Sequence, residues 1–209
     1  MRKIEAVSSN RDKQLTYKEN CAKYKKAIQE EFYFEAMLIS YEMIEDRLRS
    51  FLYHIGALAN RESIKVSCTK TKNQLKEIVD AYKMKKENNS FGITNITGKL
   101  KIIRCTLEWA ATVEDGYEDD KYLVALKNQY EGNIDIQETL SVIEELYEWL
   151  DYRNEIMHAL LNKNVDSLHT ELRERTIQGM ELARKVDSFV SHVKKRNYIR
   201  RSIKLCVEK

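Results

Sequence analysis

The complete absence of proline constrains this chain more than any other feature of its sequence. None of its 209 residues is proline and only six are glycine. These are the two residue types that most strongly disfavour the interior of a helix. At the average frequency of proline, a chain of this length would contain about ten. Because apolar residues still make up 43% of the chain, we expect long, uninterrupted helices around a buried core.

The spacing of apolar residues supports a fold made of helices alone. Over residues 17–59 they recur at steps of three and four, with a break expected at 29–31. The longest stripe consists of Met37, Tyr41, Ile44, Leu48, Phe51, Ile55 and Leu58. Further helices are expected after a capping box at Thr71, over 99–113 and 122–130, over 136–161 after a cap at Asp135, and from 166 to about 198.

These patterns predict one all-α helical bundle of about five to seven helices. We expect a flexible N-terminal segment over residues 1–16, a single helical domain over 17–198 and a basic tail over 199–209. No segment shows the period-two alternation that is typical of a half-buried strand.

Several classes of protein are excluded by what the sequence lacks. No apolar run approaches the roughly 18 residues of a membrane span, and the first residues lack the apolar core of a secretory signal. No P-loop, G-x-S-x-G or zinc-ligand spacing occurs. The four cysteines, Cys21, Cys68, Cys105 and Cys206, are scattered, which indicates reduced thiols. We therefore expect a cytoplasmic protein that uses no membrane, metal or cofactor.

Charge is unevenly distributed along the chain. The net charge is +3, but residues 184–209 hold nine basic and two acidic residues, which makes this end +7 and the remainder −4. Such asymmetry indicates either a polyanionic partner or a solvated helix end. Six basic residues alternate with aromatic and aliphatic ones, as in an RNA contact, although an acidic protein would suit them equally. They are Lys194, Lys195, Arg196, Arg200, Arg201 and Lys204.

The segment that carries chemistry lies in the predicted helix over 136–161. Its apolar stripe consists of Ile143, Leu146, Leu150, Met157 and Leu160, and Arg153 stands where a further apolar residue is expected. Burying an unpaired guanidinium is very costly, so Arg153 needs a partner or a cleft. Glu45 and Asp46 are the first acids to consider, although helix charges are by default exposed.

Two polar residues beside Arg153 complete a set suited to cleaving RNA without metal. Asn154 and His158 are four residues apart and share a helix face. A histidine can take a proton from the 2′-hydroxyl or give one to the leaving oxygen, and an arginine can hold the phosphate. An asparagine can orient the imidazole or the phosphate. Since one histidine cannot easily act on both sides of the phosphorus, a symmetric dimer would supply the second.

The pattern R-N-x-x-x-H at 153–158, late in an all-α chain and after the amphipathic run Tyr41-Glu42-Met43-Ile44-Glu45-Asp46-Arg47-Leu48, resembles the HEPN superfamily. The resemblance implies a helical bundle, a homodimer with a composite cleft, and metal-independent endoribonuclease activity through Arg153, Asn154 and His158. It also implies a toxin or antiviral defence context, with an antitoxin or regulatory protein as partner. A tyrosine two residues after the histidine is common in toxins paired with a nucleotidyltransferase. Leu160 stands there, so that partner is not implied.

Two alternatives stay open at this point. A second R-x4-H occurs at Arg49 and His54, but Phe51 and Leu52 within it favour ordinary core packing. The chain as a whole would also suit an inactive helical scaffold that binds RNA or a partner protein, with Arg153 in a structural ion pair. Exposure of Arg153 and His158 in a solvent-accessible groove at a two-fold interface would favour catalysis, whereas burial of both in the core of a monomer would favour the scaffold.

Overall fold

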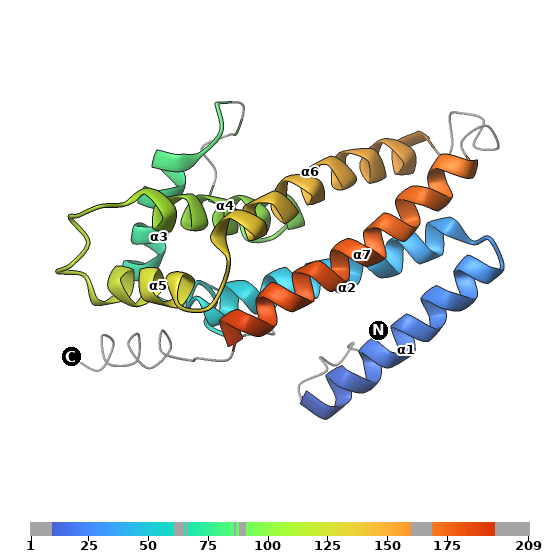
Figure 1. Ribbon diagram of the computed structural model, residues 1–209, viewed down its shortest axis with the longest axis horizontal. Coiled ribbons are helices and arrows are strands. Elements are labelled where there is room, and N and C mark those ends of the chain that lie inside the picture. The colour runs from blue at the N-terminus through green and yellow to red at the C-terminus, as the bar shows by residue number, and fades with distance from the viewer. Residues whose placement is uncertain are drawn as a thin grey trace, which may run out of the picture. The chain divides into compact units, whose positions relative to one another are not determined.

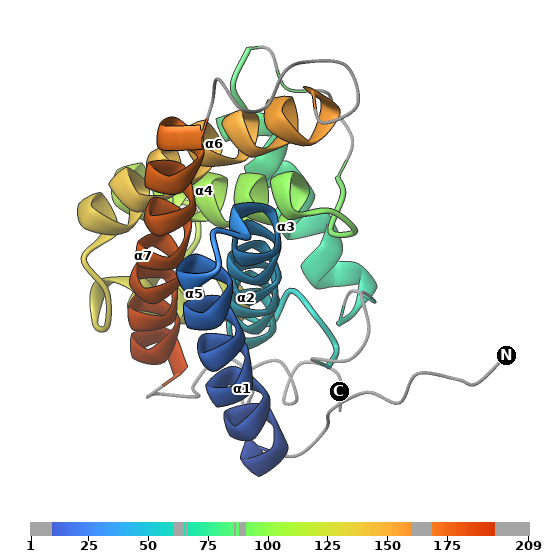
Figure 2. The same cartoon turned by 90° about the vertical axis from the view of Figure 1, so that its right-hand side faces the viewer.

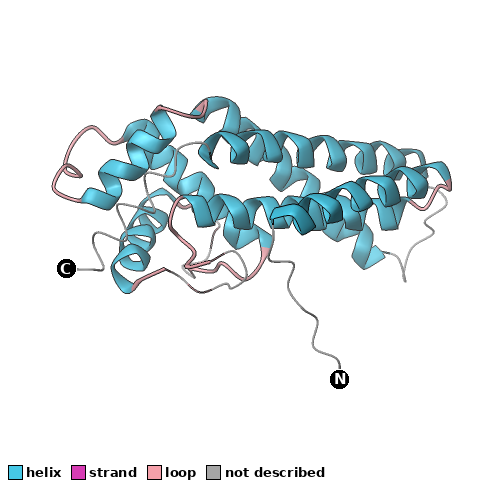
Figure 3. Cartoon of the chain, turned by 90° about the horizontal axis from the view of Figure 1, so that it is seen from below, coloured by secondary structure: helices cyan, strands magenta, loops and turns pink. Residues whose placement is uncertain are grey.

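The computed structural model describes residues 10–60, 65, 67–85, 87, 91–159 and 169–194. Within these residues every regular element is a helix, as Figure 3 shows, which confirms the predicted all-α bundle. The helices, labelled in Figure 1, are α1 (Asn10–Gln29), α2 (Tyr33–His54), α3 (Thr69–Tyr82), α4 (Ile96–Thr112), α5 (Lys121–Glu131), α6 (Ile136–Ala159) and α7 (His169–Lys194).

The chain divides into two compact units, and the expected single domain over 17–198 stays a prediction. Unit 1 consists of Met1–Ile44 and Glu148–Arg184, and unit 2 of Glu45–Tyr147 and Lys185–Lys209. Helices α2, α6 and α7 contribute residues to both units, whereas α1 belongs to unit 1 and α3, α4 and α5 belong to unit 2.

In unit 1, α1 begins at Asn10, inside the segment expected to be flexible, and ends at the predicted break. The Phe32 N–H donates to the Ala27 carbonyl at 2.8 Å and the Glu31 N–H to the Ile28 carbonyl at 3.3 Å. These two bonds form a Schellman motif, which requires a left-handed residue. Glu31 takes that role with a φ of 60°, a backbone conformation that residues other than glycine rarely adopt.

Long-range hydrogen bonds hold α1 against α2 and α7 within unit 1 (Figure 2). The Tyr17 hydroxyl donates to the Met43 carbonyl at 3.3 Å, and the Tyr24 hydroxyl to the Thr176 carbonyl at 3.2 Å. The Thr176 hydroxyl lies 2.7 Å from the Leu172 carbonyl of its own helix and 3.3 Å from the Tyr33 carbonyl of α2. The bonds of Tyr24 and Thr176 satisfy buried polar groups, so these two side chains help to specify the register of the helices.

A glycine allows α6 and α7 to approach closely in unit 1. Trp149 is fully buried, and its indole N–H donates to the Arg175 carbonyl at 2.8 Å. A Cβ on Gly179 would lie 2.4 Å from Cζ2 of that ring. Only a glycine therefore leaves room for the indole at this point of α7.

Helix starts in unit 2 follow side-chain caps, of which the sequence identified some. Asp135 caps α6 as predicted, because its carboxylate accepts from the Glu138 N–H at 2.9 Å. The predicted capping box at Thr71 is wrong. The cap of α3 is Cys68, whose sulfur accepts from the Thr71 N–H at 3.4 Å, and Thr71 is buried in the first turn. Helix α4 likewise begins three residues before the predicted start at residue 99, because Asn95 caps it.

The cap of α5 is Asp120, whose carboxylate accepts from the N–H groups of Tyr122 at 2.9 Å and Leu123 at 3.2 Å. It also pairs with Lys70 at 3.2 Å. Burial by itself would raise the pKa of this carboxyl group, but the hydrogen bonds from Leu123, Lys70 and Tyr122 outweigh that effect, so its pKa is lowered.

The core of unit 2 contains the predicted stripe of α2 together with an unpredicted set of buried cations on α4. Leu48, Phe51, Ile55 and Leu58 are fully buried, as the periodicity predicted. The α4 residues Lys99, Lys101 and Arg104 are also buried.

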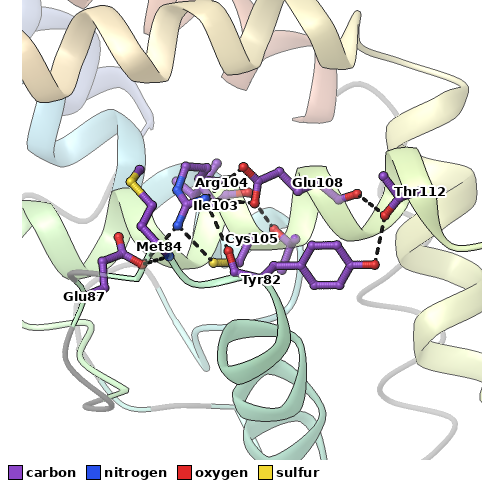
Figure 4. Close-up of polar contacts among 9 residues, drawn as sticks. Tyr82, Met84, Glu87, Ile103, Arg104, Cys105, Glu108 and Thr112 are labelled. Atoms are coloured by element: carbon purple, nitrogen blue, oxygen red, sulfur yellow. Dashed lines mark hydrogen bonds and ion pairs between the residues drawn. The ribbon is translucent and has the colours of Figure 1, made fainter.

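The carboxylates of Glu87 and Glu108 compensate the charge of Arg104 (Figure 4). Its guanidinium lies 3.0 Å from the Glu87 carboxylate and 2.8 Å from both oxygens of Glu108, and it also donates to the Tyr82 carbonyl at 3.3 Å. Burial raises the pKa of the neighbouring Cys105 thiol to about 12, although the guanidinium opposes the shift, so this cysteine is an unreactive thiol.

Candidate active site

The three predicted catalytic residues lie in the last two turns of α6, within unit 1. Asn154 and His158 are exposed, and Arg153 is half-buried. Because residues four apart on a helix are surface neighbours, with Cβ atoms about 5–6 Å apart, the amide and the imidazole lie side by side. The geometry that would have favoured a pure scaffold, with Arg153 and His158 both sealed in a core, is not found.

Among the described residues, the guanidinium of Arg153 contacts an aromatic ring. Its guanidinium carbon lies 4.4 Å from the centroid of the Tyr41 ring, from α2 in the same unit. Its Nη1 donates to Asn154 Oδ1 at 3.1 Å, and its Nε is buried with no hydrogen-bond partner. Tyr41 was predicted only as a core residue, since periodicity assigns it to the apolar stripe of α2. The sequence therefore carried no signal that it would face Arg153.

The acids considered for Arg153, Glu45 and Asp46, belong to unit 2, and both are half-buried. There Glu45 pairs with the Lys99 ammonium at 2.9 Å and with the Arg49 guanidinium at 3.5 Å. The carboxylate of Glu45 thus already has two cationic partners within its own unit. A supporting role for either acid at the catalytic residues stays a prediction.

The predicted RNA-binding residues lie at the C-terminal end of the chain. Lys194 is the last residue of α7 and is exposed. Lys195, Arg196, Arg200, Arg201 and Lys204 lie outside the described residues.

The second R-x4-H sequence has a different environment from the first. His54 is only 3% exposed and its ring packs edge-on against Tyr53, with centroids 5.2 Å apart. Arg49 pairs with Glu45. These contacts agree with its interpretation as core packing, because a buried imidazole cannot reach a large substrate such as RNA.

The aromatic residues that flank the motif are partly engaged in packing. The Tyr152 ring lies under the Arg175 guanidinium at 5.0 Å, and burial raises the pKa of its hydroxyl group. Burial likewise raises the pKa of Tyr147, in unit 2. Both hydroxyl oxygens are inaccessible to solvent, so these side chains offer at most part of a ring to a nucleic-acid base.

The orientation of α6 differs from the predicted stripe at its C-terminal end. Met157, expected to be in the core, is 37% exposed, and Ile156 is buried instead. Trp149 is buried beside the predicted Leu150. At this end of α6 the buried face therefore includes Ile156 and leaves out Met157. Met157 becomes an exposed neighbour of His158 on the helix surface.

The arrangement can bind and polarise a phosphodiester. A guanidinium held over a ring offers charge-assisted hydrogen bonds to phosphate oxygens, and an exposed imidazole can transfer protons. Among the described residues no group of three His, Cys, Asp or Glu side chains is arranged to hold a metal ion. No helix in the described part of the chain has the length and apolar character needed to cross a membrane.

Comparisons with family models, with curated proteins and with solved structures find no match to this chain.

Proposed function

We propose that this protein is a metal-independent endoribonuclease of the HEPN type. The observation that carries the proposal is the geometry of one edge of α6. There the Arg153 guanidinium stacks on Tyr41 at 4.4 Å and donates to Asn154 at 3.1 Å, while His158 is exposed one turn beyond Asn154. A phosphate-binding cation, an orienting amide and a proton-transfer group are thus neighbours on a single rigid helix.

In this reaction the RNA supplies its own nucleophile. The 2′-oxygen attacks the adjacent phosphorus and loses its proton to a base, the bond between phosphorus and the 5′-oxygen breaks, and that oxygen receives a proton from an acid. The products are a 2′,3′-cyclic phosphate and a 5′-hydroxyl. His158 acts as acid or base, Arg153 offsets the charge that develops on the phosphate oxygens, and Asn154 orients Arg153.

Proton transfer on both sides of the phosphorus calls for a second imidazole. In our proposal a homodimer supplies it, with the two α6 edges facing a shared cleft and no cofactor. The basic residues from Lys194 onward would hold the RNA backbone. The setting we propose is a cytoplasmic toxin or antiviral defence system, in which an antitoxin or regulatory protein restrains the nuclease.

The test is cleavage of a labelled single-stranded RNA mixture in EDTA by the full chain and two histidine variants. His158→Ala removes the proposed acid or base, and His192→Ala is the matched control, because His192 is also exposed and also lies in the last turn of a helix. We expect His158→Ala to lose at least about 100-fold in rate, as is typical for a proton-transfer group, and His192→Ala to keep the wild-type rate. Cleavage by His158→Ala near the wild-type rate would refute the assignment.

A second candidate, an inactive helical scaffold that binds RNA or a partner protein, is favoured by the half-burial of Arg153 against Tyr41, since such a contact also serves packing. This function predicts no cleavage by the wild type and RNA binding that His158→Ala leaves unchanged. Mapping the ends of the RNA products separates the two functions, because only the nuclease generates 2′,3′-cyclic phosphate.

A further inference from the structure

The guanidinium of Arg153 is held by contacts from two different helices of unit 1. The ring of Tyr41 comes from α2, and the side-chain oxygen of Asn154 comes from α6 itself. The distance of 4.4 Å to the ring centroid is well within the roughly 6 Å over which a cation and an aromatic face attract each other. An arginine side chain is otherwise free to adopt many rotamers, so these contacts define where its charge lies.

The two contacts fix different degrees of freedom. Contact with the ring holds the guanidinium carbon 4.4 Å from the ring centroid, and the hydrogen bond to Asn154 holds one terminal nitrogen 3.1 Å from the amide oxygen. The third contact that could orient the group is missing, because Nε is buried without a hydrogen-bond partner. Without the ring, the hydrogen bond to Asn154 would be the single polar contact of the described residues that orients this guanidinium.

This orientation brings the charge of Arg153 to the face of α6 that carries the histidine. Arg153 and His158 are five residues apart, which places them about 140° apart around the helix. Asn154 and His158 share one face, so a guanidinium drawn toward Asn154 Oδ1 lies beside that face. Since Nε is buried, the two terminal nitrogens are the donors that would meet a phosphate.

We propose that Tyr41 is a positioning residue, whose ring holds the Arg153 guanidinium in the orientation that serves a phosphate at Asn154 and His158. The inference rests on the proposed ribonuclease function and adds a residue to it from a separate helix. In this proposal the face of the ring, and not the phenolic hydroxyl, orients the guanidinium. Phenylalanine at position 41 would therefore preserve the effect, whereas leucine would remove it.

The first arm of the test detects the stacked guanidinium directly, without RNA. In an NMR spectrum of the arginine Nε–Hε groups of the full chain, a guanidinium over an aromatic ring is shifted upfield by the ring current, and Arg153→Lys assigns the signal. We expect the shifted signal in the wild type and in Tyr41→Phe, and its return to the ordinary region in Tyr41→Leu. A signal unaffected by Tyr41→Leu would overturn the proposal.

The second arm measures RNA cleavage by the same variants. We expect Tyr41→Leu to lose at least tenfold in kcat, and Tyr41→Phe to stay within twofold of the wild type. Phe34→Leu is the matched control, because it removes another half-buried aromatic ring of α2 in unit 1, and it should keep the wild-type kcat. Cleavage by Tyr41→Leu at the wild-type rate would overturn the positioning role while leaving the ribonuclease function intact. A wild type that shows the shifted signal and cleaves no RNA would refute the function and leave the contact established.

Discussion

Removing the carboxylate of Glu45 tests whether this residue serves stability or catalysis. Lys99, its partner in unit 2, is 0% exposed, and its ammonium lies 2.9 Å from Glu45 Oε1 and 3.2 Å from the Thr94 carbonyl. The Glu45 side chain is 26% exposed. In a Glu45→Ala variant the buried ammonium keeps one neutral acceptor and loses its counter-charge.

The magnitude follows from the geometry. At 2.9 Å, and with an effective dielectric constant of about 20, two unit charges attract by about 6 kcal/mol. The cost of desolvating both groups offsets much of this, and breaking a buried pair typically costs about 3–5 kcal/mol. Because Glu45 is partly exposed and the Thr94 carbonyl remains as acceptor, we expect the lower end, about 3 kcal/mol. That is a change of roughly 150-fold in the unfolding equilibrium.

The assay is a double-mutant cycle, followed by urea unfolding with circular dichroism at 222 nm. Lys99→Met replaces the charge by an apolar chain of similar length, so we expect this change alone to leave the free energy of unfolding nearly unchanged. Combined with Glu45→Ala, it should restore most of the stability that Glu45→Ala loses. Glu42→Ala, which removes an exposed glutamate of α2, should stay within about 0.5 kcal/mol of the wild type.

Two results would refute this reasoning. One is a Glu45→Ala variant within 1 kcal/mol of the wild type, and the other is a double variant as unstable as Glu45→Ala alone. The double variant also serves the functional question, because it lacks the Glu45 carboxylate but keeps most of the stability. A loss of RNA cleavage in the double variant would support a role for Glu45 beside Arg153, whereas a loss in Glu45→Ala alone would reflect stability.

Three further stability predictions follow from local geometry, each measured by urea unfolding. Gly179→Ala should destabilise by about 1–3 kcal/mol, because the clash with Trp149 exceeds the gain of about 1 kcal/mol in helix propensity; a stabilised variant would contradict this. Glu31→Gly should stabilise by about 0.5–1 kcal/mol by relieving the positive φ, whereas Glu30→Gly, the control, should not stabilise. Asp120→Ala should lower the free energy of unfolding by about 1 kcal/mol at pH 7, because the cap of α5 is lost. The pKa of Asp120 is lowered in the folded protein, so its contribution to stability is lost as the carboxylate is protonated, and the gap between variant and wild type should narrow below about pH 4. A gap that does not change with pH would contradict this.

Apolar periodicity predicted the helices well where one face of a helix is buried. The break after Gln29 was confirmed, and six of the seven stripe residues are buried, because a repeating apolar face leaves a direct pattern in the sequence. The helix itself is shorter than expected, since α2 ends at His54 and leaves Ile55 and Leu58 beyond it. Helix starts were less predictable. Cys68 caps α3 although thiols are weak acceptors and Thr71 is the stronger candidate by residue type. Asn95 extends α4 by a first turn whose one apolar residue, Ile96, is too little for a periodic pattern.

The buried cations of α4 were not predictable from the sequence. Lysine and arginine are by default exposed, and only tertiary contacts reveal the carboxylates that allow their burial. Glu45, which pairs with Lys99, is 54 residues away from it, and Glu87, which pairs with Arg104, is 17 residues away. Neither spacing is a helical repeat, so no local pattern relates these two pairs. Glu108, four residues after Arg104 on the same helix, is the one partner that local spacing indicates.

For the candidate catalytic residues, too, local geometry was predictable from the sequence and the partner from another helix was not. Placing Arg153, Asn154 and His158 together required only the geometry of one helix, and that part was accessible from the sequence. The requirement that Arg153 have a partner also followed, from the cost of burying a charge. The identity of the partner did not, because an aromatic ring that compensates a cation has the same periodicity as one that fills a core. An arginine within an apolar stripe therefore calls for the tyrosines of the facing helix to be considered beside its acids, and Tyr41 is such a residue here.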